Sequence, residues 1–157
     1  MQIQQDITGK LQDAPVGPLG EVLLPLWQET LKEIRADHRA GIDGHEIAAR
    51  IAAAMDVVVR AIYQRVVAQA WGRHALVALG GYGRCEMAPH SDVDLLFLFE
   101  KDESKSPEFI SGVLSPLWDM AFEVGHSSRT LGEVVRYARE DIESCTAMMD
   151  GRLLAGD

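Results

Sequence analysis

The stretch from residue 75 to residue 100, ALVALGGYGRCEMAPHSDVDLLFLFE, constrains the fold more than any other part of the chain. It reads as an apolar strand, a glycine turn, a short polar connection and a second apolar strand. Asp92 and Asp94 open the second strand, and because side chains alternate along a strand, both carboxylates point to one face. Gly80 and Gly81 allow a ligand to approach the backbone closely. Since Mg²⁺ prefers a few carboxylates together with phosphate oxygens, the stretch predicts a site for a divalent metal and a polyphosphate.

The composition limits the possible partners and location. The chain has 157 residues, of which 47% are hydrophobic and 25% charged, as is ordinary for one globular domain. A net charge of −9 argues against a long nucleic acid, because proteins that bind its phosphates usually carry a basic surface. No apolar run reaches the roughly 18 residues needed to cross a bilayer, and the N-terminus lacks a secretory signal. We therefore expect a cytoplasmic protein that binds neither a membrane nor a long nucleic acid.

Two long amphipathic helices are predicted before the strands. Apolar residues recur at helical spacing over residues 19–40 and again over residues 45–70, with Gly41 and Gly44 between the two helices. Residues 1–18 are polar and contain two prolines, which predicts a loose lead-in. We expect a helical segment over residues 1–72 that packs on the sheet of a core over residues 73–157, so that both form one compact domain. The first two strands are expected at residues 75–79 and 92–100.

Further helices and a third strand are predicted after the second strand. Ser106 and Pro107 form a typical helix start, and this helix should run over residues 107–117, where Pro116 kinks or restarts it. Alternation over residues 120–128 predicts the third strand, and Thr130 with Glu133 fits a capping box. A final helix is expected over residues 142–154. The elements together predict an α+β fold with a small mixed sheet.

The motifs of the chain resemble the signature of the nucleotidyltransferase superfamily that includes DNA polymerase β. The resemblance lies in GGYGR (80–84) and SDVDLL (91–96). A closer resemblance, to the catalytic domains of bacterial protein-PII uridylyltransferases, adds LWD (117–119), EVGHS (123–127) and RLLAGD (152–157). It implies a nucleotidyltransferase fold and the transfer, dependent on Mg²⁺ or Mn²⁺, of a nucleoside monophosphate from an NTP to a protein hydroxyl, with release of pyrophosphate. UTP is the implied NTP, and a PII-like regulatory protein is the implied acceptor.

The same resemblance implies roles for individual residues. Asp92 and Asp94 would bind the metal ion, and the glycine pair would hold the triphosphate. The superfamily normally adds a third carboxylate on a neighbouring strand, often as the base for the attacking hydroxyl. Asp119 is the first candidate for this third carboxylate, and Glu123 is the second.

Three other polar residues near these motifs each allow a functional and a structural interpretation. Arg84 and Arg129 would contact phosphates or form structural ion pairs, and Ser91 would bond a phosphate or cap the turn. Trp118 is expected in the core. Cys85 departs from the resemblance, because the related enzymes usually have glycine there, and a cysteine restricts the backbone.

Two alternatives to protein uridylylation stay open at this point. The chain could transfer a nucleotide to a different acceptor, or it could be a non-catalytic module that binds nucleotides. The enzymes it resembles continue into a hydrolase domain and ligand-sensing domains, so the sequence also fits an excised part of a longer protein. Uridylyl removal is therefore not expected of this chain.

Overall fold

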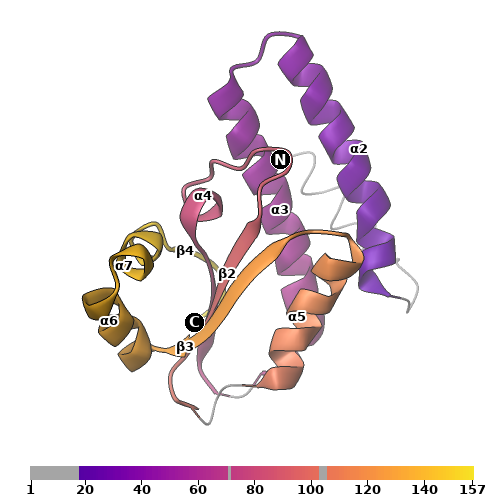
Figure 1. Ribbon diagram of the computed structural model, residues 1–157. Helices are drawn as coiled ribbons and strands as arrows, with labels where there is room; N and C mark the ends of the chain where they lie inside the picture. The colour runs from indigo at the N-terminus through magenta and orange to yellow at the C-terminus, as the bar shows by residue number, and fades with distance from the viewer. Residues whose placement is uncertain (1–17, 71, 103–105) are drawn as a thin grey trace.

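A four-stranded mixed sheet organises the fold (Figure 1). The computed structural model describes residues 18–70, 72–102 and 106–157, so the predicted lead-in lies almost wholly outside the described residues. In chain order the elements are α2 (Leu19–Arg39), α3 (Gly44–Val66), the 3₁₀ turn η1 (Val67–Gln69), β1 (His74–Ala78), α4 (Gly80–Gly83), β2 (Val93–Phe99), α5 (Pro107–Asp119), β3 (Val124–Thr130), α6 (Leu131–Glu140), α7 (Ile142–Met149) and β4 (Arg152–Gly156).

The strand order is β3-β2-β1-β4. β1 pairs antiparallel with both β2 and β4, whereas β2 and β3 are parallel and joined by the crossover helix α5. A parallel pair needs such a crossover, because its strands must begin at the same edge of the sheet. The predicted α+β fold with a small mixed sheet, flanking helices and an N-terminal pair of long helices is confirmed.

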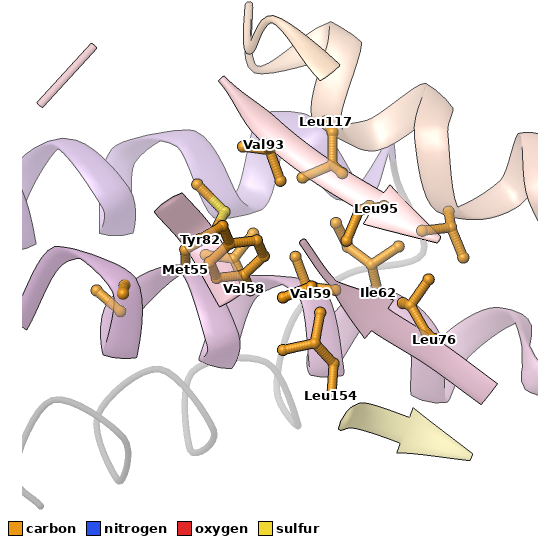
Figure 2. Close-up of a cluster of buried hydrophobic side chains, with 14 of the residues drawn as sticks. Met55, Val58, Val59, Ile62, Leu76, Tyr82, Val93, Leu95, Leu117 and Leu154 are labelled. Carbon is orange, nitrogen blue, oxygen red and sulfur yellow. The ribbon is translucent and has the colours of Figure 1, made fainter. Parts of the chain in front are cut away.

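The core lies between one face of the sheet and helices α2, α3 and α5 (Figure 1). The odd-numbered residues of β2 are buried on this face, as period-two alternation requires: Val93, Leu95, Phe97 and Phe99. Figure 2 shows Tyr82, from α4, among these buried side chains, close to Met55 of α3. The glycine turn is thus anchored in the core by its own tyrosine.

Helices α6 and α7 lie on the other side of the sheet (Figure 1). The predicted capping box before α6 is confirmed, since Glu133 N donates to Thr130 Oγ1 (3.3 Å) and Thr130 N donates to the Glu133 carboxylate (2.8 Å). The predicted cap of α5 is confirmed as well, because Phe109 N donates to Ser106 Oγ (3.2 Å). No helix in the described ranges is long and apolar enough to cross a membrane.

The end of α5 differs from the prediction. The helix runs through Pro116 to Asp119. Residues 120–122, predicted as strand, instead close the helix in a Schellman arrangement: Ala121 has φ +62°, Ala121 N donates to Trp118 O (2.8 Å) and Phe122 N donates to Leu117 O (3.1 Å). β3 therefore begins only at Val124.

The last predicted helix is also too long. α7 ends at Met149, and the residues from Arg152 to Gly156 form β4, which pairs with β1. Leu154 from this strand is buried in the core. A segment this short, with one buried leucine, has too little hydrophobic periodicity to distinguish a strand from a helix. Its pairing with a strand almost eighty residues earlier decides its conformation.

Candidate functional site

The glycine turn α4 begins directly beside the acid-bearing strand. Leu79 N, at the end of β1, donates to the Asp94 carbonyl (3.0 Å), which ties the start of the turn to β2. Gly80 has φ +54°, a left-handed conformation that glycine adopts without a steric penalty. The chain therefore changes direction at Gly80, where no side chain stands between the backbone and the Asp94 carboxylate.

The Asp94 carboxylate lies between two glycines from neighbouring elements. A Cβ atom at Gly80 would lie 3.4 Å from Asp94 Oδ2, and one at Gly125 of β3 would overlap Asp94 Oδ1. The three residues line a cavity of about 270 Å³ together with His126, Ser127 and Ala147. Burial, with the charge of Asp92 as a second cause, raises the pKa of Asp94 above its ordinary value. Asp94 is therefore a half-buried carboxylate with space for a ligand beside it.

Asp92 stands just before β2, two residues from Asp94 and exposed to solvent. Its negative charge adds to the effect of burial in raising the pKa of the Asp94 carboxyl. Two like charges so close together repel each other, and a divalent cation would relieve the repulsion. The pair consequently suits a metal that takes its remaining ligands from phosphates and water.

Neither candidate for the third carboxylate joins this pair. Within the described residues, no three His, Cys, Asp or Glu side chains are grouped to hold a metal. Asp119 is exposed at the end of α5, and a Cβ atom at Gly20 of α2 would lie 2.7 Å from Asp119 Cβ. Glu123 is closer in the sheet to the acid pair, because its carbonyl accepts from Val93 N (2.9 Å). The role of either residue stays a prediction.

Arg84 and Ser91 both have structural partners. Arg84 pairs with Glu86 (2.8 Å) and Asp150 (2.6 Å). Ser91 Oγ accepts from Ala88 N (2.8 Å), and Ser91 N donates to the Ala88 carbonyl (3.1 Å), which closes the turn before β2. A phosphate contact by Arg84 would compete with two carboxylates, whereas the Ser91 hydroxyl, which accepts one bond, can still donate its proton to a phosphate.

Arg129 lies further along β3, four residues after Gly125, which is about 13 Å at the usual rise of a strand. Its guanidinium stacks 3.8 Å from the centre of the Tyr137 ring in α6.

Trp118 was expected in the core, but it is 50% exposed, and its ring packs edge-on against the His126 ring with 6.1 Å between the ring centres. The last turn of α5 carries it past the edge of the core, so this expectation was wrong.

Sequence reasoning missed a buried ion pair behind the turn. Asp56 of α3 is only 8% exposed, and both of its oxygens accept from Arg152 of β4 (2.7 and 2.9 Å). An acid within the apolar stripe of residues 47–62 was the one available signal, because a buried carboxylate needs a cationic partner. The sequence could not identify a partner 96 residues away.

Cys85 has φ +61°, a left-handed conformation that costs an ordinary residue about 1 kcal/mol more than glycine. This backbone conformation favours glycine, the residue that the resemblance of the motifs implies at this position. We expect Cys85→Gly to be about 1 kcal/mol more stable than Cys85→Ala in urea unfolding, because both variants lose the thiol and only glycine relieves the backbone. Equal stabilities of the two variants would contradict the backbone explanation.

Gly125 keeps space free for the Asp94 carboxylate. Since a Cβ atom there would overlap Asp94 Oδ1, Gly125→Ala must displace the carboxylate. We expect the nucleotidyl transfer implied by the sequence motifs to fall about a hundredfold, the usual effect of a displacement of about 1 Å at a reacting centre. Gly132→Ala is the matched control, because a Cβ atom at Gly132 in α6 meets nothing within 4 Å. Equal activities of the two variants would exclude this role for Gly125.

Comparison with known proteins identifies the family to which the chain is similar. Residues 28–125 match the family described as "Putative nucleotidyltransferase DUF294". Curated relatives named bifunctional uridylyltransferase/uridylyl-removing enzyme include those of Novosphingobium aromaticivorans (44% identical over 123 residues, 73% of this chain), Erythrobacter litoralis (42% over 123 residues, 73% of this chain) and Cereibacter sphaeroides (53% over 85 residues, 54% of this chain). The aligned regions are 14%, 13% and 9% of those proteins, so the chain spans a small part of their length.

Proposed function

Because the chain belongs to the DUF294 family of nucleotidyltransferases, we propose that it transfers a nucleoside monophosphate from a nucleoside triphosphate to a hydroxyl group, with release of pyrophosphate. The observation that carries this proposal is the position of the Asp94 carboxylate between Gly80 and Gly125, beside a cavity and within reach of the charge of Asp92.

The acid pair fits a divalent cation of the Mg²⁺ type. Mg²⁺ is usually held by one or two carboxylates together with substrate phosphates and water, so Asp92 and Asp94 suffice as its protein ligands. A bound Mg²⁺ or Mn²⁺ supplies charge neutralisation of the triphosphate and of the departing pyrophosphate. The absence of side chains at Gly80 and Gly125 leaves space for the Asp94 carboxylate beside the cavity.

The other predicted site residues take the remaining roles in this proposal. Gly80 and Gly81 allow the triphosphate to approach the backbone of the turn. Asp119 and Glu123 are the two candidates for a base that accepts the proton of the attacking hydroxyl, and the backbone contact of Glu123 with the first residue of β2 supports Glu123. Asp119 lies at the end of α5, beside Gly20 of α2.

We further propose UTP as the donor and a PII-like regulatory protein as the acceptor. The name of the relatives, uridylyltransferase, together with their 42–53% identity supports a uridylyl donor, and the acceptor rests on the resemblance of the sequence motifs to protein-PII uridylyltransferases. Incubating the chain with each of the four ribonucleoside triphosphates, Mg²⁺ and a PII-type protein tests the proposal through released pyrophosphate. We expect release with UTP that requires both Mg²⁺ and the acceptor. Binding of UTP without any release would favour a non-catalytic nucleotide-binding module, and release with another acceptor alone would change the substrate class.

A further inference from the structure

One arginine from the last strand attaches the glycine turn to the rest of the fold. Arg152 donates from Nε to the Gly83 carbonyl (3.1 Å) and from Nη2 to the Tyr82 carbonyl (3.2 Å). The same guanidinium donates from Nη1 and Nη2 to the two oxygens of Asp56. Arg152 therefore connects three elements, namely β4, the turn α4 and the long helix α3.

The turn depends on this arginine for one of its carbonyls. Backbone amides that follow in the chain donate to the carbonyls of Leu79, Gly80 and Gly81 at 2.8–3.0 Å. The buried Gly83 has no such backbone partner within the described residues, and its carbonyl accepts from Arg152 instead. Burying a carbonyl without a hydrogen bond is costly, so the conformation at the end of the turn requires the arginine.

Asp56 holds the guanidinium in place. Its carboxylate binds Arg152 at two points, a planar geometry that a lysine ammonium cannot reproduce. Arg60 also contacts Asp56 (3.4 Å), but it donates to the Leu154 carbonyl (2.9 Å) where Arg152 donates to the carbonyls of the turn. The two arginines share one carboxylate, and only Arg152 links it to the carbonyls of α4.

We propose that Arg152 is a positioning residue for the nucleoside triphosphate, because it fixes the turn whose glycines receive the phosphates relative to helix α3. This inference rests on the proposed function. The Arg152 guanidinium already donates to four protein oxygens, so it acts through the backbone of α4 and not as a phosphate ligand. Its loss should affect the nucleotide and leave recognition of the acceptor unchanged.

Arg152→Lys tests this inference, with Arg60→Lys as the matched control. We expect the KM for UTP·Mg²⁺ to rise about tenfold in Arg152→Lys, with an unchanged KM for the acceptor, because a misplaced turn weakens phosphate binding. Amides of residues 79–86 should exchange with deuterium about tenfold faster in the same variant. Arg60→Lys should stay within about twofold of the wild type in both measurements, because lysine keeps the positive charge beside Asp56 and Arg60 donates to Leu154 rather than to the carbonyls of the turn.

The two readouts separate the inference from the proposed function. A wild-type KM and wild-type exchange of residues 79–86 in Arg152→Lys would overturn the inference, even if the variant unfolded more easily. Absence of UTP turnover in the wild type would refute the proposed function, whereas the exchange measurement would still decide whether Arg152 fixes the turn. If Arg152→Lys does not fold, Asp56→Asn replaces it, and the same two shifts in that variant support the inference while their absence overturns it.

Discussion

Replacing Asp94 by asparagine is expected to lower nucleotidyl transfer about a thousandfold without destabilising the protein. A carboxylate that holds the metal contributes several kcal/mol to stabilising the transferring phosphate, and each 1.36 kcal/mol changes the rate tenfold. Asparagine has nearly the same shape, so the variant should fold around the same cavity. Pyrophosphate release at saturating UTP and Mg²⁺ measures the loss.

The direction of the stability change follows from the raised pKa of Asp94. The folded protein binds the Asp94 proton more tightly than the unfolded chain, so stability falls as the pH rises from the unfolded pKa to the folded pKa. Above the folded pKa the ionised carboxylate is a constant cost. Asp94→Asn should therefore equal or exceed the wild-type stability at pH 7, and the advantage should shrink as the pH is lowered through this window. Solvent screens the half-exposed group, so the gain is small.

Glu33→Gln is the charge-matched control for this prediction. Glu33 is exposed on α2, and its substitution removes the same unit of charge away from the proposed site. Full activity of Asp94→Asn would refute the assignment of Asp94 as a metal ligand. A marked loss of stability in Asp94→Asn alone would show that the ionised carboxylate stabilises the fold, contrary to its raised pKa.

Replacing Gly83 by alanine is expected to have the largest effect on stability. A Cβ atom at Gly83 would overlap the Asp150 carbonyl and lie 3.0 Å from the Ala78 carbonyl, and both neighbours are backbone atoms that cannot rotate away. Forcing atoms into such a packed position typically costs up to about 3 kcal/mol, and we expect a loss of this size. The free energy of unfolding in urea measures it.

Gly44→Ala provides the control for Gly83→Ala. A Cβ atom at Gly44, the first residue of α3, meets nothing within 4 Å, and alanine favours a helix by up to about 1 kcal/mol over glycine. Gly44→Ala should therefore keep or raise the stability. If Gly83→Ala unfolded at the same urea concentration as Gly44→Ala, the close packing of the turn against the corner at Asp150 would be wrong.

Local chemistry allowed much of the fold to be predicted from the sequence. Ser106 and the Thr130–Glu133 pair cap their helices as their spacing predicts, because capping depends on residues three positions apart. The apolar run after Asp92 forms β2, and its alternation places Asp94 on the face opposite the core. The glycines and Asp94 could be expected to meet, since the turn and β2 are close in sequence.

The remaining features depend on contacts distant in sequence. β4 forms because β1 offers it an edge, and nothing within its five residues distinguishes it from the end of α7. Arg152 and Asp56 are 96 residues apart, and only the tertiary fold brings them together. Gly125 lies beside Asp94 through the parallel register of β2 and β3, which no local pattern could give. The left-handed conformation of Cys85 is likewise set by the turn that encloses it.

Transfer of labelled UTP to an acceptor tests the central claim most directly. The chain, Mg²⁺ and a PII-type protein are incubated in parallel with UTP labelled at the α-phosphate and UTP labelled at the γ-phosphate. Nucleotidyl transfer predicts that the α label alone becomes attached to the acceptor, and that Asp94→Asn abolishes this attachment. Attachment of the γ label, or α-label attachment that persists in Asp94→Asn, would contradict the account.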